Sequence, residues 1–181
     1  MPRLSQRSAA AFTLLELMTV ITVMLILAAM FMGVWSSMRN RAELAACSTN
    51  MKSLYTAAAA YVQQNGQWPQ VATNTLTTPN DTLYPNAWIN ALAPFGIAQK
   101  NWLCPSVQRE MGNPDMTKSE NVRVDYLATP FDNKPGTPFL WPHQPWFIER
   151  GSVHPGGNLI IWSNGQLVTM QEALQFVGQA Q

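Results

Sequence analysis

An uninterrupted apolar run near the N-terminus constrains this chain more than any other feature. The run covers residues 9–35, AAAFTLLELMTVITVMLILAAMFMGVW, and from Phe12 to Trp35 it contains no Lys, Arg, Asp or Pro. About 20 apolar residues in a helix are enough to cross the hydrocarbon core of a bilayer. The sequence therefore predicts one transmembrane helix over residues 12–35.

A single ionisable side chain, Glu16, interrupts this apolar run. On insertion scales an acidic residue at the centre of a span costs about 2.5–3.5 kcal/mol, and a residue retained at that cost is a functional hypothesis by default. Glu16 follows Phe12 by four positions, so both lie on one face of a helix. We expect Glu16 to have a partner. The alternative is that its carboxylate extends to the membrane interface and is hydrated there.

The apolar pattern continues beyond the predicted span with the period of a helix. Intervals of three and four residues separate the members of one stripe, which are Leu44, Cys47, Met51, Leu54, Ala58 and Tyr61. Residues 3–68 contain no proline, and Asn65-Gly66 is typical of a helix end. The sequence thus predicts one helix from about Phe12 to Gln64, in which residues 36–65 form an amphipathic half.

Residues 66–181 differ in composition and predict a small globular domain, because 12 of the 13 prolines lie at or beyond Pro69. A short helix is expected over residues 86–96, and a half-buried strand over residues 122–128. Two apolar runs within residues 158–170 flank Asn164-Gly165, which predicts a hairpin with a type I′ turn. The expected fold class is α+β, with the long N-terminal helix packed on a small antiparallel sheet.

An aromatic cluster near the middle of this domain is expected to belong to its core. It consists of Phe139, Trp141, Trp146 and Phe147. Large aromatic residues in a small sheet domain are more often core than ligand-binding residues.

Charge and motif content argue against several function classes. The chain has 11 basic and 10 acidic residues, a net charge of +1, and no cluster of Lys or Arg, so nucleic-acid binding has no electrostatic support. No Gly-x-Ser-x-Gly elbow and no phosphate-binding glycine loop is present. We therefore expect no enzymatic activity and no cofactor.

Histidine and carboxylate residues raise the question of a metal site. His143, His154, Glu149 and Asp125 are residue types that zinc accepts, but their spacing lacks the character of a ligand set. No metal is therefore expected. His154 is instead expected to be a structural residue, hydrogen-bonded at the mouth of the hairpin.

Two cysteines, Cys47 and Cys104, follow the predicted span and allow one intramolecular disulfide. The alternative is a pair of buried free thiols. The sequence LAAC at residues 44–47 looks like a lipoprotein processing box, but charged residues at positions 39, 41 and 43 separate it from the apolar run.

The N-terminal segment AFTLLELMTVITVMLILAA resembles the N-terminus of type IV prepilins and type II secretion pseudopilins. The resemblance implies that a prepilin peptidase cuts between Ala11 and Phe12, where the family usually has Gly before the cut. It further implies that residues 1–11 are a leader, that the new amino terminus is N-methylated, and that Glu16 is the one acid of the span. Here Phe12, Thr13, Leu14 and Glu16 match the family pattern position by position.

The segment HPGGNLIIWSNGQL resembles a C-terminal motif of a large group of pilin-like proteins, in which a His is followed after nine residues by Asp-Gly. Here the motif runs from His154 to Asn164-Gly165, with Asn in place of the usual Asp.

Together these resemblances imply a structural, pilin-like subunit of the inner membrane with one span. Its C-terminal domain would lie in the periplasm or outside the cell as part of a filament. The implied partners are a prepilin peptidase, related pilin subunits that contact the N-terminal helix, and an inner-membrane assembly platform. In such a filament Glu16 of an incoming chain would meet the Phe12 amine of its neighbour. Two alternatives are a membrane-tethered binding module that does not polymerise and a membrane-tethered hydrolase that uses His154.

Overall fold

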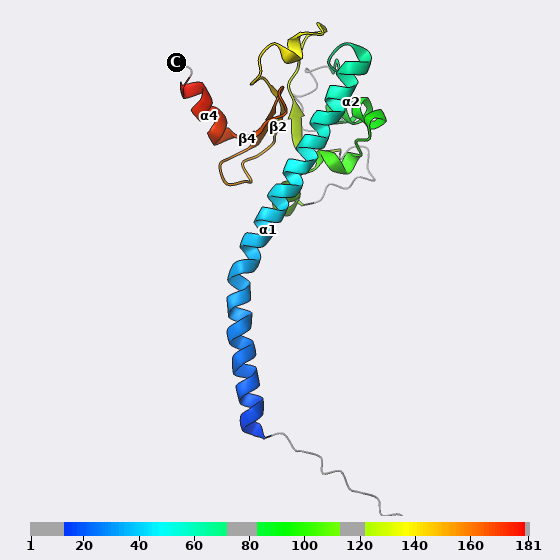
Figure 1. The fold of residues 1–181 in the computed structure, drawn as a ribbon. Helices are drawn as coiled ribbons and strands as arrows, with labels where there is room; N and C mark the ends of the chain where they lie inside the picture. The colour runs from blue at the N-terminus through cyan, green and yellow to red at the C-terminus, as the bar shows by residue number, and fades with distance from the viewer. Residues whose placement is uncertain (1–12, 72–82, 113–121, 180–181) are drawn as a thin grey trace, which may run out of the picture. The chain divides into compact units, whose positions relative to one another are not determined.

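The computed structural model describes residues 13–71, 83–112 and 122–179 (Figure 1). The predicted processing residues Ala11 and Phe12 lie outside these described residues. The chain divides into two compact units, Met1–Asn40 (unit 1) and Arg41–Gln181 (unit 2). Each unit is described by itself below.

The long N-terminal helix is present as α1, Leu14–Asn65. It begins with a capping box, in which the Thr13 N–H donates to Glu16 Oε2 at 2.9 Å and the Glu16 N–H donates to Thr13 Oγ1 at 3.2 Å. It ends at Gly66, whose N–H donates to the carbonyl of Val62 at 2.8 Å and whose φ of +72° favours glycine. Glu16 therefore has a hydrogen-bonding partner within its own chain.

Unit 1 exposes the apolar side chains of the first part of α1. Every large apolar residue from Leu14 to Met38 is about half exposed or more, with Leu14 at 75% and Trp35 at 69%. By length and composition, this part of α1 is apolar enough to span a membrane. In isolation it has no core of its own.

Unit 2 is built on the amphipathic part of α1. The expected stripe is buried at Cys47, Met51, Leu54 and Ala58, and it forms one side of the main hydrophobic core. Leu44 and Tyr61, at the two ends of the stripe, are partly buried against the same core. The period of the sequence thus identified the face of the helix that packs on the domain.

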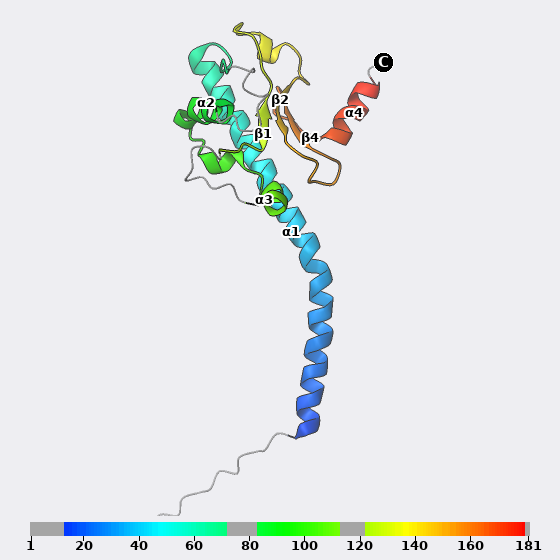
Figure 2. The ribbon, with the colours of Figure 1, turned by 180° about the vertical axis from the view of Figure 1, so that it is seen from behind.

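A four-stranded antiparallel sheet packs against this stripe, in the order β1-β2-β3-β4. The strands are β1 Tyr126–Ala128, β2 Pro145–Glu149, β3 Leu159–Trp162 and β4 Leu167–Thr169. Figures 1 and 2 show the sheet between α1 on one face and α4, Met170–Gln179, on the other. All four residues of β3 are buried, as expected for a strand covered on both faces. The predicted α+β class is confirmed.

Short helices lie between α1 and β1, and another lies between β1 and β2. They are α2 Leu83–Leu92, η2 Ala93–Phe95, η3 Gln99–Trp102, α3 Pro105–Met111 and η5 Thr137–Phe139. The expected helix over residues 86–96 corresponds to α2 and η2, which end at Gly96 in the left-handed region.

Aromatic rings fill the centre of unit 2 around Trp68, which is fully buried. Ring centroids of four neighbours lie 4.8–6.0 Å away, in Trp88, Phe131, Trp146 and Phe147. Trp146 and Phe147 are therefore core residues, as expected. The same expectation is wrong for the two other members of the cluster, because Phe139 is 51% exposed and Trp141 is 62% exposed.

The Asn164-Gly165 hairpin is present, but its turn differs from the prediction. The Gly165 N–H donates to the Trp162 carbonyl at 2.9 Å, and the Trp162 N–H donates to the Gln166 carbonyl at 3.0 Å. Only Gly165 has a positive φ in this loop, +80°, so the pattern is a type I turn followed by a left-handed glycine. A type I′ turn would require positive φ at Asn164 as well. The predicted turn type is therefore wrong.

The strand expected over residues 122–128 is shorter in the structure, where β1 covers Tyr126–Ala128 alone. Just before it, the Asp125 N–H donates to the Trp102 carbonyl at 2.8 Å. The chain ahead of β1 is thus bonded to the end of η3. Val124 is nevertheless buried, in keeping with the predicted alternation.

Candidate functional site

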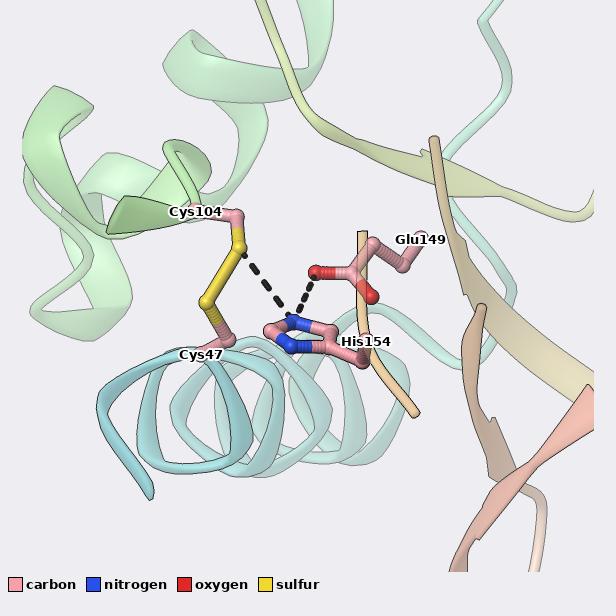
Figure 3. Close-up of side chains that lie close together, drawn as sticks. All are labelled: Cys47, Cys104, Glu149 and His154. Atoms are coloured by element: carbon pink, nitrogen blue, oxygen red, sulfur yellow. Dashed lines mark hydrogen bonds and ion pairs between the residues drawn. A yellow bond between two sulfur atoms is a disulfide. The ribbon is translucent and has the colours of Figure 1, made fainter. Parts of the chain in front are cut away.

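Four chemically reactive side chains meet in the core of unit 2 (Figure 3). They are Cys47 of α1, Cys104 immediately before α3, Glu149 at the end of β2, and His154 in the connection from β2 to β3. Each offers one donor atom, and the four donor atoms all lie within 4.8 Å of one another. All four residues are buried, so we refer to this group as the Cys-Cys-His-Glu cluster.

Cys47 and Cys104 form a disulfide, with 5.1 Å between their Cα atoms. Of the two states that the sequence left open, the structure has the bridged one. Side chains hold the backbone of both cysteines. Tyr126 Oη donates to the Cys47 carbonyl at 3.3 Å, and the Cys104 N–H donates to Asp125 Oδ2 at 2.9 Å. The bridge ties the amphipathic part of α1 to the segment that precedes α3.

His154 faces two partners through the same ring nitrogen. Its Nε2 lies 3.1 Å from Glu149 Oε1 and 3.6 Å from Cys104 Sγ. The other carboxylate oxygen of Glu149 accepts the Leu159 N–H at 3.1 Å, which fixes the orientation of the carboxyl group. His154 is thus a buried, hydrogen-bonded residue whose partner comes from β2 and not from the turn of the hairpin.

Burial dominates the protonation of this cluster. It raises the pKa of Glu149 to about 7; the Leu159 N–H opposes the shift, and the nearby Asp125 carboxylate adds to it. Burial also lowers the pKa of His154 below its ordinary value. Both shifts favour the neutral forms of the two side chains, in which the Glu149 hydroxyl can donate to His154 Nε2.

The geometry does not match the relay of a cysteine or serine hydrolase. In such a relay the histidine uses one ring nitrogen for the nucleophile and the other for the acid that orients it. Here Cys104 and Glu149 both face Nε2, and the sulfur is held in a disulfide. The cluster is instead a point at which several donor atoms converge.

Two residues considered as metal ligands on sequence grounds lie elsewhere. The His143 ring packs against the rings of Trp162 and Phe176, with centroids at 4.6 and 5.8 Å. Asp125 accepts the Cys104 N–H and pairs with Arg123 Nε at 2.8 Å. Of the four residues, the structure brings together only His154 and Glu149 as converging donors.

Sequence reasoning missed the role of the cysteines beside His154, because no local spacing links residues on four separate segments. It also missed the capping box of α1, for which a signal was present. Thr13-x-x-Glu16 directly before an apolar run is the pattern of that motif.

The turn residues of the C-terminal motif have a structural role at α1. Tyr55 Oη of α1 donates to the Ser163 carbonyl at 3.0 Å. A Cβ atom added to Gly165 would lie 3.1 Å from the Tyr55 ring. Asn164 Oδ1 accepts the Gln166 N–H at 2.9 Å and closes the turn locally. The turn therefore packs directly on the helix.

Comparison with protein-family models, with curated proteins and with solved structures found no match. The features on which a function can be argued are therefore those of this chain itself, namely the exposed apolar helix with Glu16 and the buried Cys-Cys-His-Glu cluster.

Proposed function

We propose that this chain is a pilin-like subunit that assembles through its N-terminal helix into a type II secretion pseudopilus or a type IV pilus-like filament. A prepilin peptidase would remove residues 1–11 before assembly. One observation supports this proposal above the others. A long, exposed apolar helix with a single carboxylate at its start precedes a domain that has its own core.

The exposed apolar surface of unit 1 has to be covered. Burying one Val, Leu, Ile, Met or Phe side chain contributes about 1.5–3 kcal/mol. Seventeen large apolar side chains are exposed between Leu14 and Met38, which corresponds to a total on the order of 25–50 kcal/mol. Lipid can cover this surface before assembly, and the helices of neighbouring subunits can cover it afterwards.

Glu16 provides a site where a neighbouring subunit could dock in a defined register. The N–H and Oγ1–H of Thr13 both donate to Glu16 Oε2, at 2.9 Å each. Among the residues that the structure describes, none donates to Oε1. The amine created by cutting before Phe12 of a neighbour would supply that donor. Removing one partner of a buried ion pair costs about 3–5 kcal/mol, enough to make assembly depend on Glu16.

Processing is tested by mass spectrometry of the membrane form. The proposal expects a mature chain that begins with N-methylated Phe12. An intact Met1, or a lipid attached to Cys47, would contradict it. A chain that is processed at Phe12 but never enters a sheared filament fraction would indicate a tethered binding module instead.

Assembly is tested with three variants that separate the charge of Glu16 from its capping role. Glu16→Ala removes both, whereas Glu16→Gln keeps a capping-box side chain without the charge. Thr13→Ala weakens the cap and keeps the charge. We expect all three to insert, Thr13→Ala to assemble, and both Glu16 variants to be lost from sheared filaments and from pull-downs with a tagged parent subunit. Assembly of Glu16→Gln at the parent level would refute the docking role.

A further inference from the structure

The Cys-Cys-His-Glu cluster has the composition and geometry of a metal site. We propose that, when the Cys47–Cys104 disulfide is reduced, the two thiolates, His154 Nε2 and Glu149 Oε1 bind one Zn²⁺ ion. The disulfide and the bound ion are then two alternative cross-links at the same place. This inference does not depend on filament assembly.

Distances support the proposal. In a tetrahedral zinc site with Zn–S of about 2.3 Å and Zn–N and Zn–O of about 2.0–2.1 Å, the edges S···N and N···O measure about 3.6 and about 3.3 Å. Cys104 Sγ lies 3.6 Å from His154 Nε2, and that nitrogen lies 3.1 Å from Glu149 Oε1. All four donor atoms already lie within 4.8 Å of one another, and the two sulfur atoms, now bonded to each other, have to separate for the ion to bind.

The orientation of the donors is also that of a ligand set. A metal takes one nitrogen from a histidine, and both neighbours of His154 converge on that one nitrogen, as Figure 3 shows. The second oxygen of Glu149 is held by the Leu159 N–H, and Asp125 holds the backbone of Cys104. Such outer contacts orient ligands before the ion binds.

Ligand chemistry selects zinc. Two thiolates and an imidazole suit Zn²⁺, and four protein ligands in a buried position form a closed site of the structural class. The site has no open position for a substrate, so its expected effect is to hold α1 to the segment before α3.

Conversion of the disulfide state into the zinc-bound state requires a reductant. A dithiol reductant transfers two electrons and two protons to the Cys47–Cys104 disulfide, which becomes two thiols while the reductant becomes a disulfide. Binding of Zn²⁺ then releases both thiol protons, together with the proton of Glu149 wherever that residue is protonated. Reoxidation requires that the ion leaves.

The test uses the full chain in detergent micelles under anaerobic conditions. The protein is reduced with a dithiol, the reductant is removed, and Zn²⁺ is titrated against a chromogenic chelator. We expect one Zn²⁺ per reduced chain and none for the oxidised chain. Co²⁺ in place of Zn²⁺ should give thiolate-to-metal charge-transfer absorption and the intense visible bands of tetrahedral cobalt.

Variants assign the ligands. His154→Asn and Glu149→Gln should each weaken Zn²⁺ binding by at least the roughly 10–100-fold that loss of an outer-shell contact costs. His143→Asn, which changes the histidine outside the cluster, is the matched control and should bind as the parent does. Binding to the oxidised chain, or parent affinity in both ligand variants, would overturn the proposal.

Loss of structure on reduction is also informative. If the reduced chain loses its native tryptophan fluorescence, one equivalent of Zn²⁺ should restore it in the parent. Failure of Zn²⁺ to restore it, or a folded reduced chain that takes up no Zn²⁺, would likewise overturn the proposal.

Discussion

Replacing Glu149 with Gln should change how the stability of unit 2 depends on pH. Glu149 is 1% exposed, and burial raises its pKa from 4.5 to about 7. An acid with a raised pKa holds its proton more tightly in the folded state. Its contribution to stability is therefore fully present below pH 4.5 and is lost as the pH rises through about 7. At 1.36 kcal/mol per pKa unit the loss amounts to about 3 kcal/mol.

Glutamine removes this titration while it keeps the hydrogen bonds. Its side-chain oxygen can accept the Leu159 N–H, and its amide can donate to His154 Nε2, as the protonated Glu149 does. The pKa of His154 is lowered in the folded state. The contribution of His154 to stability is therefore lost as the pH falls below 6.5, whereas that of Glu149 is lost as the pH rises. The contribution of His154 is common to both proteins and largely cancels in their difference.

The measurement is urea unfolding of the full chain in micelles, followed by tryptophan fluorescence, from about pH 4.5 to about pH 8.5. As the pH rises across this range, we expect the free energy of unfolding of the variant to increase by about 3 kcal/mol relative to that of the parent. Glu172→Gln, which makes the same substitution at an exposed carboxylate at the start of α4, is the matched control for the loss of one acidic side chain. A difference for Glu149→Gln that stays constant within about 0.5 kcal/mol would refute the reasoning.

Three further predictions concern the core of unit 2 and are read out by the same unfolding measurement, with a chelator present. Replacing Cys47 and Cys104 together with Ala should cost about 4 kcal/mol, because the disulfide closes a loop of 57 residues, and reductant should destabilise the parent but not the variant. Gly165→Ala should cost about 1–3 kcal/mol, since a side chain there has a strained φ and meets the Tyr55 ring; an unchanged midpoint would contradict the described turn. Trp68→Ala should cost about 3–5 kcal/mol, and a loss below about 1 kcal/mol would show that the aromatic core is not as described.

Most of the fold was predicted from the periodicity of apolar residues and from the residues that end helices. The stripe that includes Met51 and Leu54 identified the buried face of α1 because helical spacing is a local property. The turn type could not be obtained in this way, since Asn-Gly fits both a type I′ turn and a type I turn with a left-handed glycine. Tyr55 and Ser163, which are in contact, are 108 residues apart in the sequence, so no local pattern predicts this contact.

The candidate site was harder to predict than the fold. Cys47 and Cys104 are separated by 57 positions, and their approach to His154 depends on how α1 packs on the sheet. Trp141 shows the same limit, because its aromatic character suggested burial whereas its position after η5 leaves it 62% exposed. Tertiary contacts between distant segments decide both cases.

The disulfide also determines how unit 2 responds to mechanical tension. A force applied between α1 and the C-terminus passes from Cys47 through the sulfur atoms to Cys104 and bypasses the residues between them. That enclosed segment holds Trp68 and Trp88, and it bears no load while the bridge is intact. At about 3.3–3.6 Å per extended residue, the 57 positions would otherwise add roughly 190–205 Å to the stretched length. The extension of unit 2 under load is therefore limited by one covalent bond in its interior.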